Sequence, residues 1–334
     1  MNHQSPSPLL CVGFEGSSVN DDLRSILARG VRNVILFARN YIDRAQLTEL
    51  CREVKTIGSA DAPILICVDH EGGRVQRFID GFTKIPSMRE VGRLAQEGEL
   101  ETAEHRARSL AHVMASELRS CNIDLNLAPV LDVDSNPDNP VIGERSFGRD
   151  PHLVARLGCA MIESLQSNGV AACGKHFPGH GDTSTDTHFE LPRLPHEMLR
   201  LREIELVPFI AAIKAGVSCI MTTHVMFDAL DRHYPATMSE RVIQGLLRNQ
   251  LKFDGVVITD DLEMKAIADH FGVENGAVRA CAAGVDMLMC CHTPDRQHAM
   301  IDALEKAVAD GVIPQRRIDE SLRRINKLHA RFVR

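Results

Sequence analysis

The 334-residue chain contains no tryptophan, and aromatic residues account for only 4% of it, so its core must be built mainly from aliphatic side chains. It also has no excess of basic residues: 38 Lys and Arg are set against 45 Asp and Glu, which gives a formal net charge of −7. A nucleic-acid-binding surface needs a basic patch. The basic residues of 316–334 alternate with apolar residues at helical spacing, which is typical of a solvated helix face. We therefore expect no nucleic-acid partner.

Membrane-spanning and secretory segments are missing as well. No apolar run approaches the roughly 20 residues that a membrane helix needs, and residues 1–8 are polar and lack the apolar centre of a signal peptide. The ten cysteines form no C-x-x-C motif, and Cys67, Cys173 and Cys219 lie within apolar runs, which fits buried thiols in a reducing compartment. We expect a cytoplasmic protein without a membrane partner, and we favour a monomer.

Short apolar, β-branched runs alternate along the chain with longer amphipathic stretches. Eight runs predict strands, at 9–14, 33–37, 64–69, 125–133, 171–176, 219–224, 255–260 and 286–290. The amphipathic stretches predict helices, at 21–28, 44–57, 100–121, 151–167, 198–215, 240–251, 276–283, 298–309 and 317–332.

The strand runs are apolar nearly throughout instead of alternating, which is typical of parallel strands buried on both faces. Eight βα units in a chain of this length predict an α/β fold, namely a (β/α)8 TIM-type barrel formed as a single domain by residues 1–334. An open, doubly wound sheet is the alternative. It is weakened because residues 13–16, after the first run, do not match the G-x-G-x-x-G motif of dinucleotide-binding sheets.

Polar residues recur where the apolar runs stop. The residues at these positions are Asp69, Lys175, His176, His224 and Asp260. In a parallel barrel the C-terminal ends of the strands surround one mouth, where catalytic residues lie. We therefore expect these side chains, which are up to 190 positions apart, to meet in one site.

The segment 175–188 reads K-H-F-P-G-H-G-D-T-S-T-D-T-H and follows a buried run. Pro178 and Gly179 exclude a regular helix, and a packed core does not tolerate so many ionisable groups without partners. The segment therefore predicts a binding or catalytic loop. The H-x-x-x-H spacing of His176 and His180 makes a zinc hydrolase an alternative, although that spacing turns two ligands the same way only on a helix.

Two features of the sequence suggest catalysis. Asp260, at the end of a buried run, could be a nucleophile, a general base or a metal ligand, while Asp261 could cap the following helix. Asp186 stands two residues before His188, so its carboxylate could accept the imidazole N–H and help His188 transfer a proton near neutral pH. From spacing alone, a surface histidine with an incidental neighbour is equally open.

The segment 175–188 resembles the signature of the β-N-acetylhexosaminidases of glycoside hydrolase family 3. Four further segments resemble that family: L-F-A-R-N at 36–40, D-H-E-G-G-R-V-Q-R at 69–77, G-E-R-S-F at 143–147 and I-T-D-D-L-E-M at 258–264. The resemblance extends over about residues 9–330 and is to the short, one-domain bacterial members, which are cytoplasmic and act in cell-wall recycling. Thr187, where Ser is common, is a departure from which we expect no consequence.

The resemblance implies a retaining exo-β-N-acetylglucosaminidase that removes N-acetylglucosamine from 1,6-anhydro-N-acetylmuramic acid muropeptides, without a metal or organic cofactor. It implies Asp260 as the nucleophile and His188, oriented by Asp186, as the proton donor and acceptor. The residues implied to hold the sugar are Asp69, Arg77, Arg145, Lys175 and His176. A non-catalytic sugar-binding barrel is a further alternative, and the presence of Asp260, Asp186 and His188 together argues against it.

Overall fold

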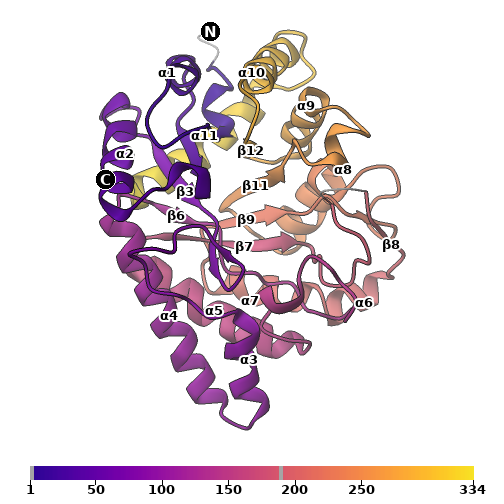
Figure 1. Ribbon diagram of the computed structural model, residues 1–334. Coiled ribbons are helices and arrows are strands. Elements are labelled where there is room, and N and C mark those ends of the chain that lie inside the picture. The colour runs from indigo at the N-terminus through magenta and orange to yellow at the C-terminus, as the bar shows by residue number, and fades with distance from the viewer. Residues whose placement is uncertain (1–3, 188–190) are drawn as a thin grey trace.

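Eight parallel strands close into a barrel in the computed structural model, which describes residues 4–187 and 191–334 (Figure 1). In order around the barrel the strands are β1 (Leu10–Val12), β2 (Asn33–Leu36), β3 (Leu65–Val68), β6 (Leu125–Asn126), β7 (Ala171–Phe177), β9 (Cys219–Thr222), β11 (Val256–Asp261) and β12 (Met287–Cys290). Each strand coincides with one of the eight predicted runs, so the predicted (β/α)8 barrel is confirmed. None of the helices in the described residues is long and apolar enough to cross a membrane.

Helices surround this barrel (Figure 1). They are α1 (Asp21–Ala28), α2 (Arg44–Ile57), α3 (Met88–Gln96), α4 (Leu100–Ser120), α5 (Pro151–Ser167), α6 (Met198–Glu203), α7 (Leu206–Lys214), the π-helix η5 (Arg241–Gln250), α8 (Lys265–Ala268), α9 (Val273–Ala283), α10 (Pro294–Ala309) and α11 (Gln315–Phe332). Side-chain caps define several starts: Asn20, Asp43 and Asp150 accept N–H groups of the first turns of α1, α2 and α5.

The structure differs from the predicted elements in several places, of which three bear on the barrel and its helices. The predicted helix 198–215 is two helices, because the chain leaves the helical conformation at Ile204. The predicted strand 125–133 pairs as a strand only over β6 and then runs on as an irregular, buried segment. Helix α3 was not predicted, although Ser87 and Glu90 form a capping box at its start, which is a readable signal in the sequence.

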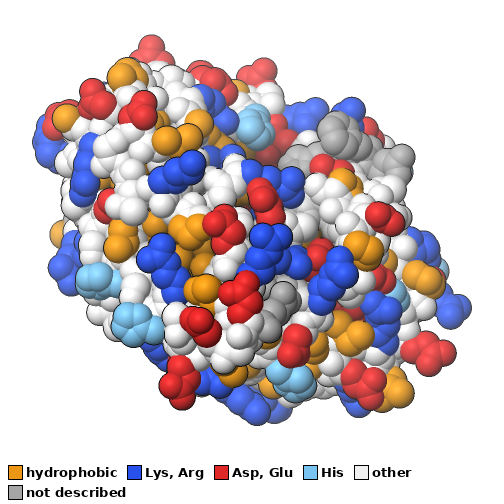
Figure 2. Space-filling model, turned by 60° about the horizontal axis from the view of Figure 1, so that its bottom comes forward, with side chains coloured by type: hydrophobic (Ala, Val, Ile, Leu, Met, Phe, Trp, Pro, Cys, Tyr) orange, Lys and Arg blue, Asp and Glu red, His pale blue; other side chains and the backbone are white. Residues whose placement is uncertain are grey.

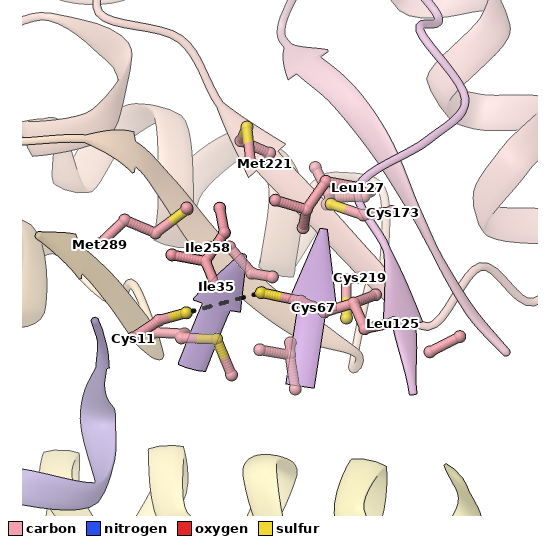
Figure 3. Packing of buried hydrophobic residues seen from close by; sticks show 14 of the residues in the cluster. Cys11, Ile35, Cys67, Leu125, Leu127, Cys173, Cys219, Met221, Ile258 and Met289 are labelled. Carbon is pink, nitrogen blue, oxygen red and sulfur yellow. Dashed lines mark hydrogen bonds between the residues drawn. The ribbon is translucent and has the colours of Figure 1, made fainter. Parts of the chain in front are cut away.

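Layers of side chains fill the barrel interior, as is usual when alternate strands contribute each layer. Cys11 is in register with Leu65 through Asn33. Because the strands are tilted, the level shifts by two residues for every two strands, and Cys67 lies level with Cys11, with the two sulfur atoms 3.6 Å apart. The same count around the barrel gives one layer of Cys11, Cys67, Cys173 and Ile258 and, above it, one of Ile35, Leu127, Met221 and Met289 (Figure 3). Burial raises the pKa of the Cys173 thiol to about 12, so these cysteines are apolar filling, as predicted from their positions in buried runs.

The next layer toward the C-terminal ends of the strands is polar. Two residues beyond the thiol layer, the same four strands carry Gly13, Asp69, Lys175 and Asp260. A Cβ on Gly13 would lie 2.2 Å from the carbonyl oxygen of Cys291, so only glycine fits at this place. The register of the barrel therefore brings three of the predicted site residues to one level at the mouth.

On the face shown in Figure 2, Lys and Arg side chains are interspersed with Asp and Glu side chains, and hydrophobic side chains form small groups. This mixture agrees with the absence of a basic cluster in the sequence.

At the other end of the barrel, Asp286 joins the last strand to the outer helices. Its fully buried carboxylate accepts hydrogen bonds from Arg248 of η5 at 2.5 Å and from Arg317 of α11 at 2.6 Å. Arg324 lies 3.3 Å from the same carboxylate, and the backbone N–H of Val257 donates to it at 3.0 Å. One anion thus holds three cations that are costly to leave unpaired inside a protein.

We predict that Asp286→Ala lowers the free energy of unfolding by about 3–5 kcal/mol, because it leaves buried guanidinium groups without their anion. Urea titration measures the change. The control is Asp254→Asn, which removes a carboxylate that is 57% exposed and pairs with Arg323 and Arg324, and it should cost no more than about 1 kcal/mol. Equal effects of the two variants would contradict this role of Asp286.

His70 is buried in an aromatic group beside the barrel mouth. It begins β4 (His70–Gly72), and its ring centroid lies 5.7 Å from that of Phe78 and 5.8 Å from that of Phe82. Among residues 4–187 and 191–334, neither of its ring nitrogens has a hydrogen-bond partner. Burial, with a smaller effect of the Arg77 charge, lowers the pKa of His70 to about 4.

This pKa predicts a loss of stability at low pH. Between about pH 6.5 and pH 4, the unfolded chain binds a proton at His70 that the folded protein does not, so acidification through this window favours unfolding. His70→Phe removes this protonation site. Between pH 7 and pH 4.5 the free energy of unfolding should therefore decrease in both proteins, but the decrease in the variant should be smaller by about 2 kcal/mol. Urea titrations at both pH values test this, and His105→Phe, at an exposed position on α4, should leave the wild-type pH dependence unchanged.

Candidate active site

A cavity of about 340 Å³ opens at the C-terminal ends of the barrel strands. Among its lining residues are Asp69, Arg77, Arg145, Lys175, His176 and Asp260. The structure therefore brings together all five residues predicted to hold a sugar and the predicted nucleophile, in the part of a (β/α)8 barrel where active sites lie.

An ion-pair network of Asp69, Glu71, Arg77, Arg145 and Lys175 forms one wall of this cavity. Glu71 is its centre: Arg145 donates to both carboxylate oxygens, at 2.9 and 2.8 Å, and Lys175 donates to one of them at 2.6 Å. Lys175 also donates to Asp69 at 2.6 Å, and Asp69 lies 3.4 Å from Arg77. Burial alone would raise the pKa of Glu71, but the charges of Arg145 and Lys175 hold it well below its usual range. Glu71, Arg145 and Lys175 are therefore ionised.

Glu71 was not predicted as a site residue, although it lies within the quoted segment 69–77. It reaches the network because β4 pairs with β5 (Val75–Gln76) in a tight hairpin. Gly72 has φ +100°, and a Cβ there would lie 2.6 Å from the side chain of Ile85, so the hairpin requires glycine. Asn126 fixes the other end of β4, with its side chain bonded to both the N–H and the carbonyl of His70.

Asp260 lies in a β-bulge of β11. Ile258 pairs with Met287 and Asp261 with Met289, so β11 holds one residue more than its partner strand between these pairs. Bulges turn side chains out of the regular alternation and are frequent beside active sites. The backbone N–H of Asp261 donates to the Asp260 carboxylate at 2.9 Å.

The charge of Asp260 is maintained by its surroundings. Burial alone would raise the pKa of this carboxyl, but His176, His224, the N–H of Asp261 and the charge of Lys175 together lower it below its ordinary value. Asp260 is thus a partly buried anion at neutral pH, which is the form that a nucleophile requires.

His224 follows β9 and is fully buried beside Asp260 and Asp261. Its Nε2 donates to the carbonyl oxygen of Asp261 at 3.0 Å, and its Nδ1 lies 2.8 Å from the hydroxyl of Thr237. Burial lowers its pKa. His224 therefore supports the backbone after the bulge instead of facing the cavity as a free acid.

β7 carries a second bulge, between Gly174 and Phe177, which contains Lys175 and His176. Nδ1 of His176 lies 2.7 Å from the carboxylate of Asp132, a fully buried residue in the irregular segment after β6. Asp132 was not predicted as a site residue. The signal available was a charged residue within the otherwise apolar run 125–133.

The predicted acid–base pair lies only partly within the described structure. His188 falls outside the described residues. Asp186 is partly exposed, and Thr187, which lies between the two, is buried and lines the cavity. The carbonyl of Thr187 accepts the N–H of Ala266 at 3.2 Å, and its hydroxyl lies 3.3 Å from Nε2 of His180. The loop is therefore attached to the cavity wall immediately before His188.

Part of the cavity lining is apolar. Among its apolar residues are Ile35, Phe37, Met221, Met264, Met289 and Cys291. His292, half-exposed at the rim and not predicted, lies 3.3 Å from Asp261, and this hydrogen bond raises the pKa of the imidazole. Outside residues 1–3 and 188–190, no three His, Cys, Asp or Glu side chains converge in an arrangement that would hold a metal ion.

Comparison with known sequences gives the family. The sequence model of the glycosyl hydrolase family 3 N-terminal domain matches residues 9–328. The chain is 40% identical over 309 residues to a beta-hexosaminidase from Nitrosomonas eutropha, covering 91% of this chain and 87% of that protein. It is 42% identical over 286 residues to a beta-hexosaminidase from Thiobacillus denitrificans, covering 86% and 78%.

Solved structures agree with this assignment. A glycoside hydrolase family 3 beta-N-acetylglucosaminidase from a Paenibacillus species has a TM-score of 0.94 and 44% identity over 99% of this chain, which spans 62% of that longer chain. NagZ from Neisseria gonorrhoeae, solved in complex with N-trifluoroacetyl-D-glucosamine, has a TM-score of 0.83 and 33% identity, covering 96% and 91% of the two chains. The chain belongs to glycoside hydrolase family 3 and is a β-hexosaminidase-type glycoside hydrolase.

Proposed function

We propose that the chain is a single-domain, retaining exo-β-N-acetylglucosaminidase that removes N-acetylglucosamine from 1,6-anhydro-N-acetylmuramic acid muropeptides, and that it acts in the cytoplasm in peptidoglycan recycling. The observation that carries the proposal is an ionised Asp260 facing a cavity whose other side is the ion-pair network. The names of the relatives and the N-trifluoroacetyl-D-glucosamine complex of the gonococcal NagZ support N-acetylglucosamine as the sugar.

The lining of the cavity suits such a sugar. The network and the neighbouring His176 present donors and acceptors to sugar hydroxyls, through Asp69, Arg77, Arg145, Lys175 and His176. The apolar part of the lining presents thioether and thiol groups that suit the methyl of an acetamido group.

The reaction proceeds in two steps under this proposal. Asp260 attacks the anomeric carbon and forms a glycosyl ester while His188 protonates the departing oxygen. His188 then removes a proton from water, which attacks the same carbon and releases Asp260 with overall retention of configuration. Asp186 accepts the imidazole N–H and keeps His188 oriented in both steps.

We predict that Asp260→Asn lowers kcat on p-nitrophenyl N-acetyl-β-glucosaminide at least about a thousandfold, equivalent to about 4 kcal/mol of barrier, because the amide cannot form the ester. Inhibition by N-acetylglucosamine should persist within a few-fold, since the sugar-binding wall is unchanged. Asp269→Asn, at an exposed position after α8, is the control.

Retention of more than about a tenth of the wild-type rate in Asp260→Asn would reject Asp260 as the nucleophile. The wild-type assay is repeated after treatment with EDTA. Loss of activity together with one tightly bound zinc per chain would favour the metal-dependent hydrolase instead.

A second test concerns His188. His188→Ala should slow hydrolysis of the natural disaccharide far more than formation of the glycosyl-enzyme from an activated aryl glycoside, because a good leaving group needs little protonation. The second step should also slow, so the aryl substrate should give a burst, and azide should restore turnover with a β-configured product. Asp186→Asn should give a milder form of the same defect. Equal slowing of both substrates without a burst or rescue would show that the proton donor is another residue.

A further inference from the structure

Asp132 has no part in the reaction described above, yet it holds two residues of the catalytic loop. Its carboxylate is 1% exposed and accepts three N–H groups. Nδ1 of His176 lies 2.7 Å from one oxygen, the backbone N–H of His180 donates to the other at 2.7 Å, and the backbone N–H of His176 is 3.2 Å from both.

The first consequence concerns the ring of His176. A carboxylate can only accept at Nδ1, so this nitrogen carries a proton and Nε2 is the ring atom turned away from Asp132. Nε2 lies 3.5 Å from the guanidinium of Arg145. His176 and Arg145 both line the cavity, whereas Asp132 does not. Asp132 therefore acts on the cavity through the orientation of His176.

The second consequence concerns the path of the loop. The N–H of His180 meets Asp132, and the backbone at Gly181 packs so closely on Val133 that a Cβ there would lie 1.7 Å from the Val133 carbonyl oxygen. His180 in turn contacts Thr187 through Nε2 at 3.3 Å. The segment that begins at Asp132 thus contacts the loop at His176, His180 and Gly181, and His180 in turn contacts Thr187, the residue before His188.

An amide at position 132 could not replace this carboxylate. Burial alone would raise the pKa of Asp132, but His176, His180 and the backbone N–H groups lower it, so the group is an anion with two accepting oxygens. Asparagine has one accepting oxygen and an NH2 group. In Asp132→Asn, either the His180 N–H faces that NH2 group, donor against donor, or His176 must take the other tautomer, in which Nδ1 accepts from the NH2 group and Nε2 carries the proton.

We propose that Asp132 is a positioning residue of the sugar-binding wall, which holds Nε2 of His176 toward the cavity and anchors the start of the catalytic loop. The proposal rests on the proposed function, because it treats His176 as a sugar-binding residue. It assigns Asp132 no contact with the substrate.

A double-mutant cycle tests this inference. The variants are Asp132→Asn, His176→Ala and their combination, with KM and kcat measured on p-nitrophenyl N-acetyl-β-glucosaminide and inhibition by N-acetylglucosamine measured as Ki. We expect Asp132→Asn to raise KM and Ki at least tenfold and to lower kcat by a smaller factor. The reason is that the substitution acts on the sugar-binding residue His176 and not on the reacting groups. In the His176→Ala background, Asp132→Asn should change Ki by less than twofold.

Asp134→Asn is the matched control. Asp134 lies two residues further on, is equally buried, and pairs with Arg89 at 2.6 Å and Arg149 at 3.6 Å instead of with the loop. It should leave KM and Ki within twofold of the wild type. The inference would be overturned if the effects of Asp132→Asn and His176→Ala on Ki multiplied in the double variant. It would also be overturned if Asp134→Asn raised Ki as much as Asp132→Asn does.

A measurement on the wild type keeps the inference testable if Asp132→Asn does not fold. In protein labelled with 15N-histidine, the ring signals of His176, assigned with His176→Ala, should show a proton on Nδ1. An unprotonated Nδ1 would overturn the proposed orientation. An inactive wild type or an active Asp260→Asn would count against the proposed function, whereas independent effects at 132 and 176 with an inactive Asp260→Asn would reject this inference alone.

Discussion

The side chain of Lys175 is only 2% exposed, and the arrangement of the site depends on how its charge is compensated. A charge in this position is tolerated only with oppositely charged groups in direct contact. Asp69 and Glu71, both 2.6 Å away, supply two negative charges, and each of these carboxylates also pairs with an arginine, Asp69 with Arg77 and Glu71 with Arg145. Each charged group of the network thus lies beside a group of opposite charge.

This compensation leaves the wall rigid and ready to bind. A hydroxyl group entering the cavity meets donors and acceptors that are already oriented, so little ordering remains to be done when the sugar binds. Lys175 also acts on Asp260, because Lys175 and His176 contribute to lowering the pKa of that carboxyl. Under the proposed function, binding of the sugar and ionisation of the nucleophile therefore both involve these two residues.

The barrel provides the geometry for this set. Two layers of aliphatic and sulfur-containing side chains give a closed floor, and the register then brings Asp69, Lys175 and Asp260 to one level at the mouth. Bulges in β7 and β11 turn the last residues of these strands out of the regular alternation. Polar groups that would be destabilising one layer lower can here contact one another and the substrate.

Local patterns in the sequence were sufficient for the barrel and for four of the residues that line the cavity. Continuous apolar runs identified all eight strands, because a strand buried on both faces has no other pattern. Polar residues at the ends of those runs identified Asp69, Lys175, His176 and Asp260, because strand ends of a parallel barrel meet at one mouth. Only the tertiary structure revealed Glu71 and Asp132. Their roles are to compensate and orient groups that are remote in sequence, and such roles depend on distances between side chains that no local pattern encodes.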